Sequence, residues 1–189
     1  MVMASSIRRL GAAILVSLMA VAGARPDGAR AQDGQELLIK VKAAFLYNFA
    51  GYVTWPEERR QGPLALSILG ESGVEPLLRA TASKRKVNGR SLEVRVLDSV
   101  TPASAGHLLF VPAAACDSLA VTAARLAGQP VLIVADRPGA ALRGEAAISF
   151  VMVKGKPKFE ISRTMLAQAG LTASSHLLKL AILADPEGG

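Results

Sequence analysis

Short apolar runs that alternate with helix-prone segments are the feature that most constrains the fold of this chain. Three of these runs have the length of buried strands: LALSILG (64–70), HLLFV (107–111) and PVLIVAD (130–136). A fourth, SLEVRVL (91–97), alternates between apolar and charged residues, which predicts a strand covered on one face. The segments between them, such as 74–83, favour helix. Strands that alternate with helices are typical of a mostly parallel sheet flanked by helices. The sequence therefore predicts an α/β protein, and 189 residues suit one core.

The end of the chain changes its pattern. AAISFVMV (146–153) and PKFEIS (157–162) are two apolar segments joined by Lys154-Gly155-Lys156. Two such segments around a short glycine turn indicate a β-hairpin. We expect an antiparallel hairpin at one edge of the sheet, followed by short helices over 163–169 and 174–183.

The first residues have the pattern of an export signal. Arg8 and Arg9 precede an apolar run, residues 10–22, and a small-x-small site, Ala29-Arg30-Ala31, follows it. We predict a signal peptide over residues 1–31 and a single domain over residues 32–189. A cut after Ala24 is the alternative.

The charge and the cysteine content limit which molecules the chain could bind and which covalent links it could form. Without residues 1–31 the chain keeps 18 basic and 14 acidic residues, a net charge of +4. This mild excess gives no reason to expect nucleic acid as a partner. Cys116 is the single cysteine, so it cannot form an intramolecular disulfide, and a buried thiol is its expected state.

No catalytic or metal-binding constellation emerges from the polar residues. The chain has two histidines, too few with one cysteine for a usual zinc or copper site. His107 opens a strand, and His176 follows Ser174, which is placed to cap a helix. The sequence predicts no catalytic residue, no metal and no cofactor.

Three residues at strand ends could form a ligand cleft. Asp136 ends a strand, and Gly70 and Ser72 follow another. Ligands of parallel sheets gather at the carboxyl ends of strands. We predict a small-molecule cleft at Gly70, Ser72 and Asp136, with a turn role for Asp136 as the alternative.

Five of the eight aromatic residues lie in VKAAFLYNFAGYVTWP, residues 41–56. Apolar residues recur there at steps of three and four, which predicts a helix over 36–55 that Pro56 ends. Phe45, Phe49 and Tyr52 form one stripe, which we expect to face the core.

Tyr47, Asn48 and Trp55 lie off that stripe. Aromatic side chains with a polar tip are favoured at protein interfaces. We therefore predict that these three residues belong to a dimer or partner surface.

Two segments resemble the YfiR family of periplasmic regulators. KAAFLYNFAGYVTWP (42–56) is similar to its opening motif, and FEISRTMLAQAGLTASSHLLKLA (159–181) is similar to its closing motif. The resemblance covers about residues 36 to 183. The chain departs from the family pattern at Ser162, where asparagine is common, and in lacking cysteine pairs, which puts redox control in doubt.

This resemblance implies a periplasmic α/β protein that binds and restrains an inner-membrane signalling enzyme. In the best-known relative that enzyme is a diguanylate cyclase of cyclic-di-GMP signalling, and an outer-membrane lipoprotein sequesters the repressor. A homodimer is also implied. Two alternatives remain from the residues themselves: a periplasmic small-molecule-binding module, or an exported hydrolase using a serine with His107 or His176.

Overall fold

The computed structural model describes residues 27–185, with side chains from Gln32 onward. The chain divides into two compact units, one up to Gln35 and one from Glu36, and the second contains the sheet. The predicted signal peptide lies outside the described residues, except that helix α1 (Asp27–Tyr52) begins before its end. Within the described part, no helix is both long and apolar enough to cross a membrane.

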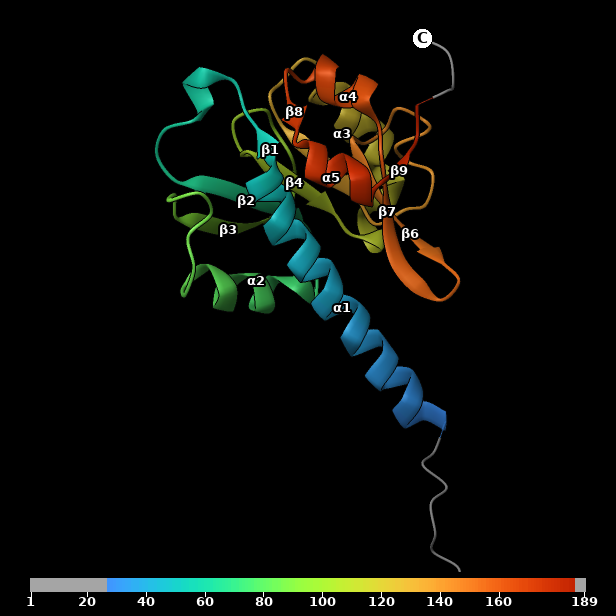
Figure 1. The fold of residues 1–189 in the computed structure, drawn as a ribbon. Helices are drawn as coiled ribbons and strands as arrows, with labels where there is room; N and C mark the ends of the chain where they lie inside the picture. Colours follow the sequence, from blue (N-terminus) through green and yellow to red (C-terminus); the bar gives the residue numbers. More distant parts are fainter. Residues whose placement is uncertain (1–26, 186–189) are drawn as a thin grey trace, which may run out of the picture. The chain divides into compact units, whose positions relative to one another are not determined.

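A seven-stranded sheet with the order β3-β2-β4-β5-β6-β7-β9 forms the centre of the second unit (Figure 1). Its first five strands are mutually parallel and are, in chain order, β2 (Leu64–Leu69), β3 (Leu92–Leu97), β4 (Leu108–Val111), β5 (Leu132–Ala135) and β6 (Ile148–Val153). Every residue of β2, β4 and β5 is buried. This burial explains their unbroken apolar runs, because helices cover both faces of a parallel sheet. The predicted α/β class and mostly parallel sheet are confirmed.

The predicted hairpin is present, and one short strand lies beyond it. β6 pairs antiparallel with β7 (Lys156–Ile161). Lys154 and Gly155 form the turn with positive φ angles of 50° and 72°, the conformation that two-residue hairpin turns need. The short strand β9 (Ile182–Leu183) then pairs parallel with β7 and forms the edge. The predicted last helix is therefore too long, since α5 (Ser175–Leu180) ends before β9.

Helices divide the apolar side chains into two cores, one on each face of the sheet. The larger core joins the sheet to α1, α2 (Val74–Ala82), α4 (Arg163–Gln168) and α5. The other joins it to a 3-10 segment, η2 (Ala113–Ser118), and to α3 (Leu119–Arg125). In Figure 1, α1 and α5 accordingly lie in front of the sheet and α3 behind it. A second 3-10 segment, η1 (Glu57–Arg59), precedes β2.

Two residues cap the first turn of α4. The Ser162 hydroxyl accepts a hydrogen bond from Met165 N–H at 3.2 Å. The Asp185 carboxylate accepts from the N–H groups of Arg163 and Thr164, at 2.9 and 3.1 Å. Serine and asparagine cap helices almost equally well, so the serine at position 162 is a suitable cap.

Replacing Asp185 by asparagine should lower the free energy of unfolding at pH 7 by roughly 2 kcal/mol. Burial alone would raise the pKa of Asp185, but hydrogen bonds from Arg163, Thr164 and Ser162 outweigh it and lower the pKa to about 2. The ionised carboxylate therefore stabilises the fold above the ordinary pKa of 3.8, and this contribution disappears as the pH falls toward 2. Urea unfolding of both proteins between neutral and acid pH measures the difference. A gap that stays constant down to pH 3 would contradict this assignment.

Candidate functional site

The core face of α1 is formed by small and aliphatic side chains together with one phenylalanine. Ala43, Leu46, Phe49 and Ala50 are all buried. Tyr52 is 37% exposed, so its expected place in the core is wrong. The buried stripe passes through the two alanines and the leucine, and Tyr52 lies at its margin.

The phenylalanines of α1 belong to an aromatic cluster within the larger core. The ring of Phe49 lies 4.9 Å from that of Phe159 and 6.1 Å from that of Phe150, between ring centroids. Phe45 packs against the same two rings at 5.4 and 6.1 Å. These rings fill the space between α1 and the β6–β7 hairpin, since neighbouring side chains are small.

Trp55 is buried, which corrects its predicted place on a partner surface. Its side chain is 3% exposed, and its Nε1–H donates to the carbonyl oxygen of His107 at 3.2 Å. Helix α1 ends at Tyr52, and the two-residue strand β1 (Val53–Thr54) then pairs antiparallel with β8 (Thr172–Ala173). This change from helix to strand directs Trp55 inward, whereas the prediction assumed a helix as far as residue 55.

The outer side of α1 presents a polar and aromatic stripe. Ala44, Asn48 and Tyr52 are exposed and follow one another at steps of four residues, so they lie on one side of the helix. The Tyr52 ring lies 5.1 Å from the ring of exposed His176 on α5. Tyr47 is half-buried, and its hydroxyl donates to the Lys86 carbonyl at 3.0 Å.

We call Ala44, Tyr47, Asn48, Tyr52 and His176 the α1 surface. It is amphipathic, because it combines two tyrosines and an imidazole with an exposed amide side chain. Such side chains favour contacts with another protein. The partner role of Tyr47 and Asn48 stays a prediction. Sequence reasoning missed Tyr52 and His176, although the spacing of Asn48 and Tyr52 indicated a common side.

Asp136 forms an ion pair with Lys42 at the carboxyl end of β5. Lys42 Nζ lies 2.7 Å from each carboxylate oxygen and 5.9 Å from the centre of the Phe150 ring. The two side chains are 15% and 20% exposed. Lys42 therefore connects α1 to the sheet through the carboxylate that we predicted to meet a ligand.

Gly70 and Ser72 follow β2 near the same edge of the sheet. Gly70 has a φ of 76° and donates its N–H to the Leu97 carbonyl. The Ser72 hydroxyl lies 3.5 Å from Val74 N, at the start of α2. Neither of the hollows described below is lined by Gly70, Ser72 or Asp136. A cleft at these residues stays a prediction.

His107 is a buried structural histidine in this fold. Its Nδ1 accepts from Ala65 N–H at 3.0 Å, so Nε2 carries the proton and donates to the Arg59 carbonyl at 3.0 Å. Burial, together with the charges of Arg59 and Arg90, lowers the pKa of His107. The expected cap at Ser174 is confirmed, since its hydroxyl accepts from Leu177 N–H at 3.2 Å.

The remaining groups with possible metal or redox chemistry lie apart. Among residues 27–185, no three histidine, cysteine, aspartate or glutamate side chains come together as metal ligands. Cys116 is buried, and burial raises the pKa of its thiol. A protonated buried thiol is a weak nucleophile.

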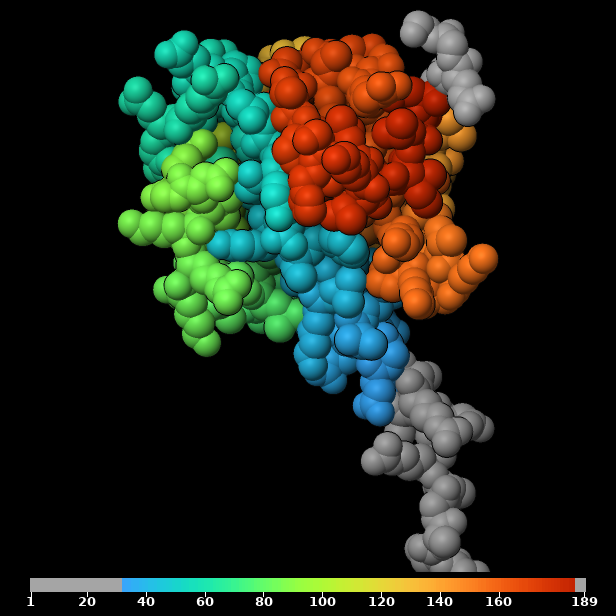
Figure 2. Space-filling model, in the orientation of Figure 1, coloured from blue at the N-terminus to red at the C-terminus, as the bar shows by residue number. Residues whose placement is uncertain are grey.

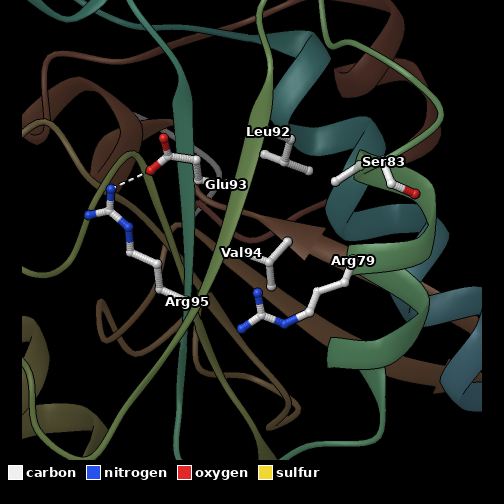
Figure 3. A pocket seen from close by; sticks show the side chains of 7 residues that line it. Arg79, Ser83, Leu92, Glu93, Val94 and Arg95 are labelled. Carbon is white, nitrogen blue, oxygen red and sulfur yellow. Dashed lines mark hydrogen bonds and ion pairs between the residues drawn. The ribbon is translucent and has the colours of Figure 1, made fainter.

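Two hollows open on the second unit. The first has a volume of about 420 Å³ and is lined by Arg79, Ala82 and Ser83 and by residues 92–95 of β3. In Figure 3, Leu92 and Val94 lie on the side of β3 toward α2, and Glu93 and Arg95 lie on the other side. The second has a volume of about 450 Å³ and lies between α3 and α4, with Leu126 and Met165 among its apolar lining and Arg143 and Glu145 among its charged lining.

The fold and the site define a small α/β domain of the mostly parallel class, with one long helix crossing its sheet. A family model described as YfiR/HmsC-like matches residues 39–182. The chain belongs to the YfiR/HmsC-like family, which is known for periplasmic regulators. A search of curated proteins found no match.

Proposed function

We propose that this protein is a non-catalytic periplasmic regulator that binds and restrains an inner-membrane signalling enzyme of the diguanylate cyclase type. The observation that carries this proposal is the family match over residues 39–182. In this proposal the signal peptide over residues 1–31 exports the chain, the mature protein forms a homodimer, and an outer-membrane lipoprotein can sequester it.

The α1 surface is the proposed contact with the periplasmic segment of that enzyme. Asn48 and Tyr52 are exposed on the helix that carries the opening family motif, and His176 lies on the helix of the closing motif. The strand pair β1–β8 joins the end of the opening motif to the middle of the closing motif. A partner that recognises the family would therefore meet both motifs at one place.

In-cell photo-crosslinking tests this proposal directly. A photo-crosslinking amino acid replaces Asn48, and the mature chain carries a C-terminal tag for recovery under denaturing conditions. We expect to recover a membrane protein with a periplasmic segment and a cytoplasmic signalling domain. Tyr52→Ala should reduce this crosslink several-fold, because it removes a large exposed ring beside position 48.

Leu142→Ala is the matched control, since Leu142 is 65% exposed and lies in the loop before β6. It should leave the crosslink unchanged.

Deleting the gene should raise the cellular level of cyclic-di-GMP. Recovery of no membrane protein from position 48, at wild-type protein level, would argue against the α1 surface as the contact. An unchanged level of cyclic-di-GMP after deletion of the gene would argue against the regulatory role.

The hollow between α3 and α4 favours a second role, the binding of a small molecule. Its volume of about 450 Å³ lies within the usual range of ligand sites, and its lining is mostly apolar with a few charged groups. Thermal unfolding with a panel of nucleotides, amino acids and sugars tests this role. A ligand that binds the folded state should raise the midpoint, and Ala123→Trp in the wall should abolish that rise.

A further inference from the structure

Strand β3 has one row of backbone groups that pair with no other strand among residues 27–185. It is the first strand in the sheet order, so β2 is its one neighbour among the strands described. Leu64 N–H donates to the Ser91 carbonyl, and Gly70 N–H donates to the Leu97 carbonyl. Backbone groups alternate in direction along a strand, so the odd-numbered residues of β3 face β2. The N–H and C=O groups of Leu92, Val94 and Val96 therefore point to the open edge.

A groove follows this edge. The hollow of about 420 Å³ is bounded by the edge strand and by the C-terminal half of α2. Figure 3 shows Leu92 and Val94 on the side of β3 that faces α2, and the Arg79 side chain extending from α2 toward Val94. An open strand edge beside a helix is the arrangement that accepts an extended peptide as an added strand.

The charge around this groove favours an acidic occupant. Residues 74–97 contain six basic and two acidic residues, a net charge of +4. Both acidic residues form ion pairs within this stretch, Glu75 with Arg79 and Glu93 with Arg95. Three further basic residues, Lys84, Arg85 and Lys86, are exposed in the loop after α2. Figure 2 shows this stretch (green) on the side of the domain opposite the β6–β7 hairpin (orange).

A second copy of the chain fits this edge less well. Two copies paired through β3 would place two basic stretches side by side, and like charges at an interface weaken association. The Nε of Arg79 is held by Glu75 at 2.7 Å, while its two terminal nitrogens have no hydrogen-bond partner among the described residues. These nitrogens are placed to receive a carboxylate.

We propose that the groove between α2 and β3 binds an extended acidic polypeptide segment, which adds to β3 as a new edge strand. Backbone hydrogen bonds to Leu92, Val94 and Val96 hold the segment, and Arg79 and Lys84 to Lys86 select its acidic side chains. This site adjoins the α1 surface at Tyr47, whose hydroxyl donates to the Lys86 carbonyl, but its binding groups are those of α2, β3 and the loop between them. It does not depend on the proposed regulatory role, because its test needs purified protein and synthetic peptides alone.

Amide exchange measured by NMR tests the proposal on the purified mature chain. The probe is a short peptide of alternating glutamate and valine, and the comparison peptide carries lysine in place of glutamate. At saturation the acidic peptide should slow exchange at the amides of Leu92, Val94 and Val96 by about tenfold or more. Added salt should weaken binding, because the selecting charges are exposed.

Two variants separate the backbone contribution from the charge. Val96→Pro removes an outward N–H without removing a bond to β2, and it should abolish the protection. Arg79→Glu should weaken binding about fivefold or more. Lys156→Glu, an exposed basic residue on β7, should change affinity little, and thermal unfolding shows whether each variant is folded.

Three results would overturn the proposal. These are no protection of β3 with the acidic peptide, equal protection with the lysine peptide, or protection in the free protein that increases with protein concentration. The last result would assign the edge to a second copy of the chain.

Discussion

Replacing Trp55 by alanine should lower the free energy of unfolding by about 3–5 kcal/mol, the usual cost of removing a large aromatic side chain from a core. Trp55 is 3% exposed and belongs to the larger core. The change removes a buried ring and leaves a cavity in the larger core beside His107. Urea unfolding followed by far-ultraviolet circular dichroism measures the loss, because this variant has no tryptophan fluorescence.

Two companion variants test whether the predicted loss comes from the burial of the Trp55 ring. Trp55→Phe should cost about 1–2 kcal/mol, because the His107 carbonyl keeps a second bond from Leu132 N–H at 2.8 Å. Tyr52→Ala should lower the free energy of unfolding by much less than Trp55→Ala does, since Tyr52 is 37% exposed. Similar losses for Tyr52→Ala and Trp55→Ala would show that the two aromatics are not divided between surface and core.

Removing either partner of the Lys42–Asp136 pair should lower the free energy of unfolding by about 2–3 kcal/mol, because it leaves the other charge desolvated and unpaired. Lys42→Met and Asp136→Asn are the variants. The Lys42 and Asp136 side chains are 15% and 20% exposed, so we expect a smaller loss of stability than for a fully buried pair. The double variant should cost less than the sum of the single changes, by about 1–2 kcal/mol of coupling.

The Lys40–Glu36 pair on the same helix is a matched control. Its side chains are 54% and 65% exposed, so Lys40→Met should cost less than about 0.5 kcal/mol. Equal losses for Lys40→Met and Lys42→Met would mean that the Lys42–Asp136 contact does not anchor α1. Denaturant unfolding of the wild type and the four variants under one condition makes the comparison.

The sequence predicted the architecture well because buried parallel strands appear as unbroken apolar runs. β2, β4 and β5 were found in this way, and the alternation in β3 correctly indicated one covered face, with Leu92 and Val94 buried and Glu93 and Arg95 exposed. The strands β1, β8 and β9 have two residues each, and so short a strand has no periodicity to detect.

The site was harder to predict, for two physical reasons. The side of α1 that faces the core is set by Ala43, Leu46 and Ala50, whose small side chains carry less weight in a pattern than aromatic rings. The position of Trp55 depends on where the helix ends, and the pairing of β1 with β8 ends it before Pro56. That pairing joins distant parts of the chain, which local patterns do not reveal.

The β1–β8 pair has a consequence for how the protein is made. Val53 pairs with Ala173, and Leu177 of α5 packs in the same core as Leu46 and Phe49 of α1. The long first helix therefore completes its packing only when residues 172–177 have been synthesised. Contacts so distant in sequence form late and slow the acquisition of the native state. We expect the nascent chain to remain loosely structured until that segment emerges, a state that suits the export proposed above.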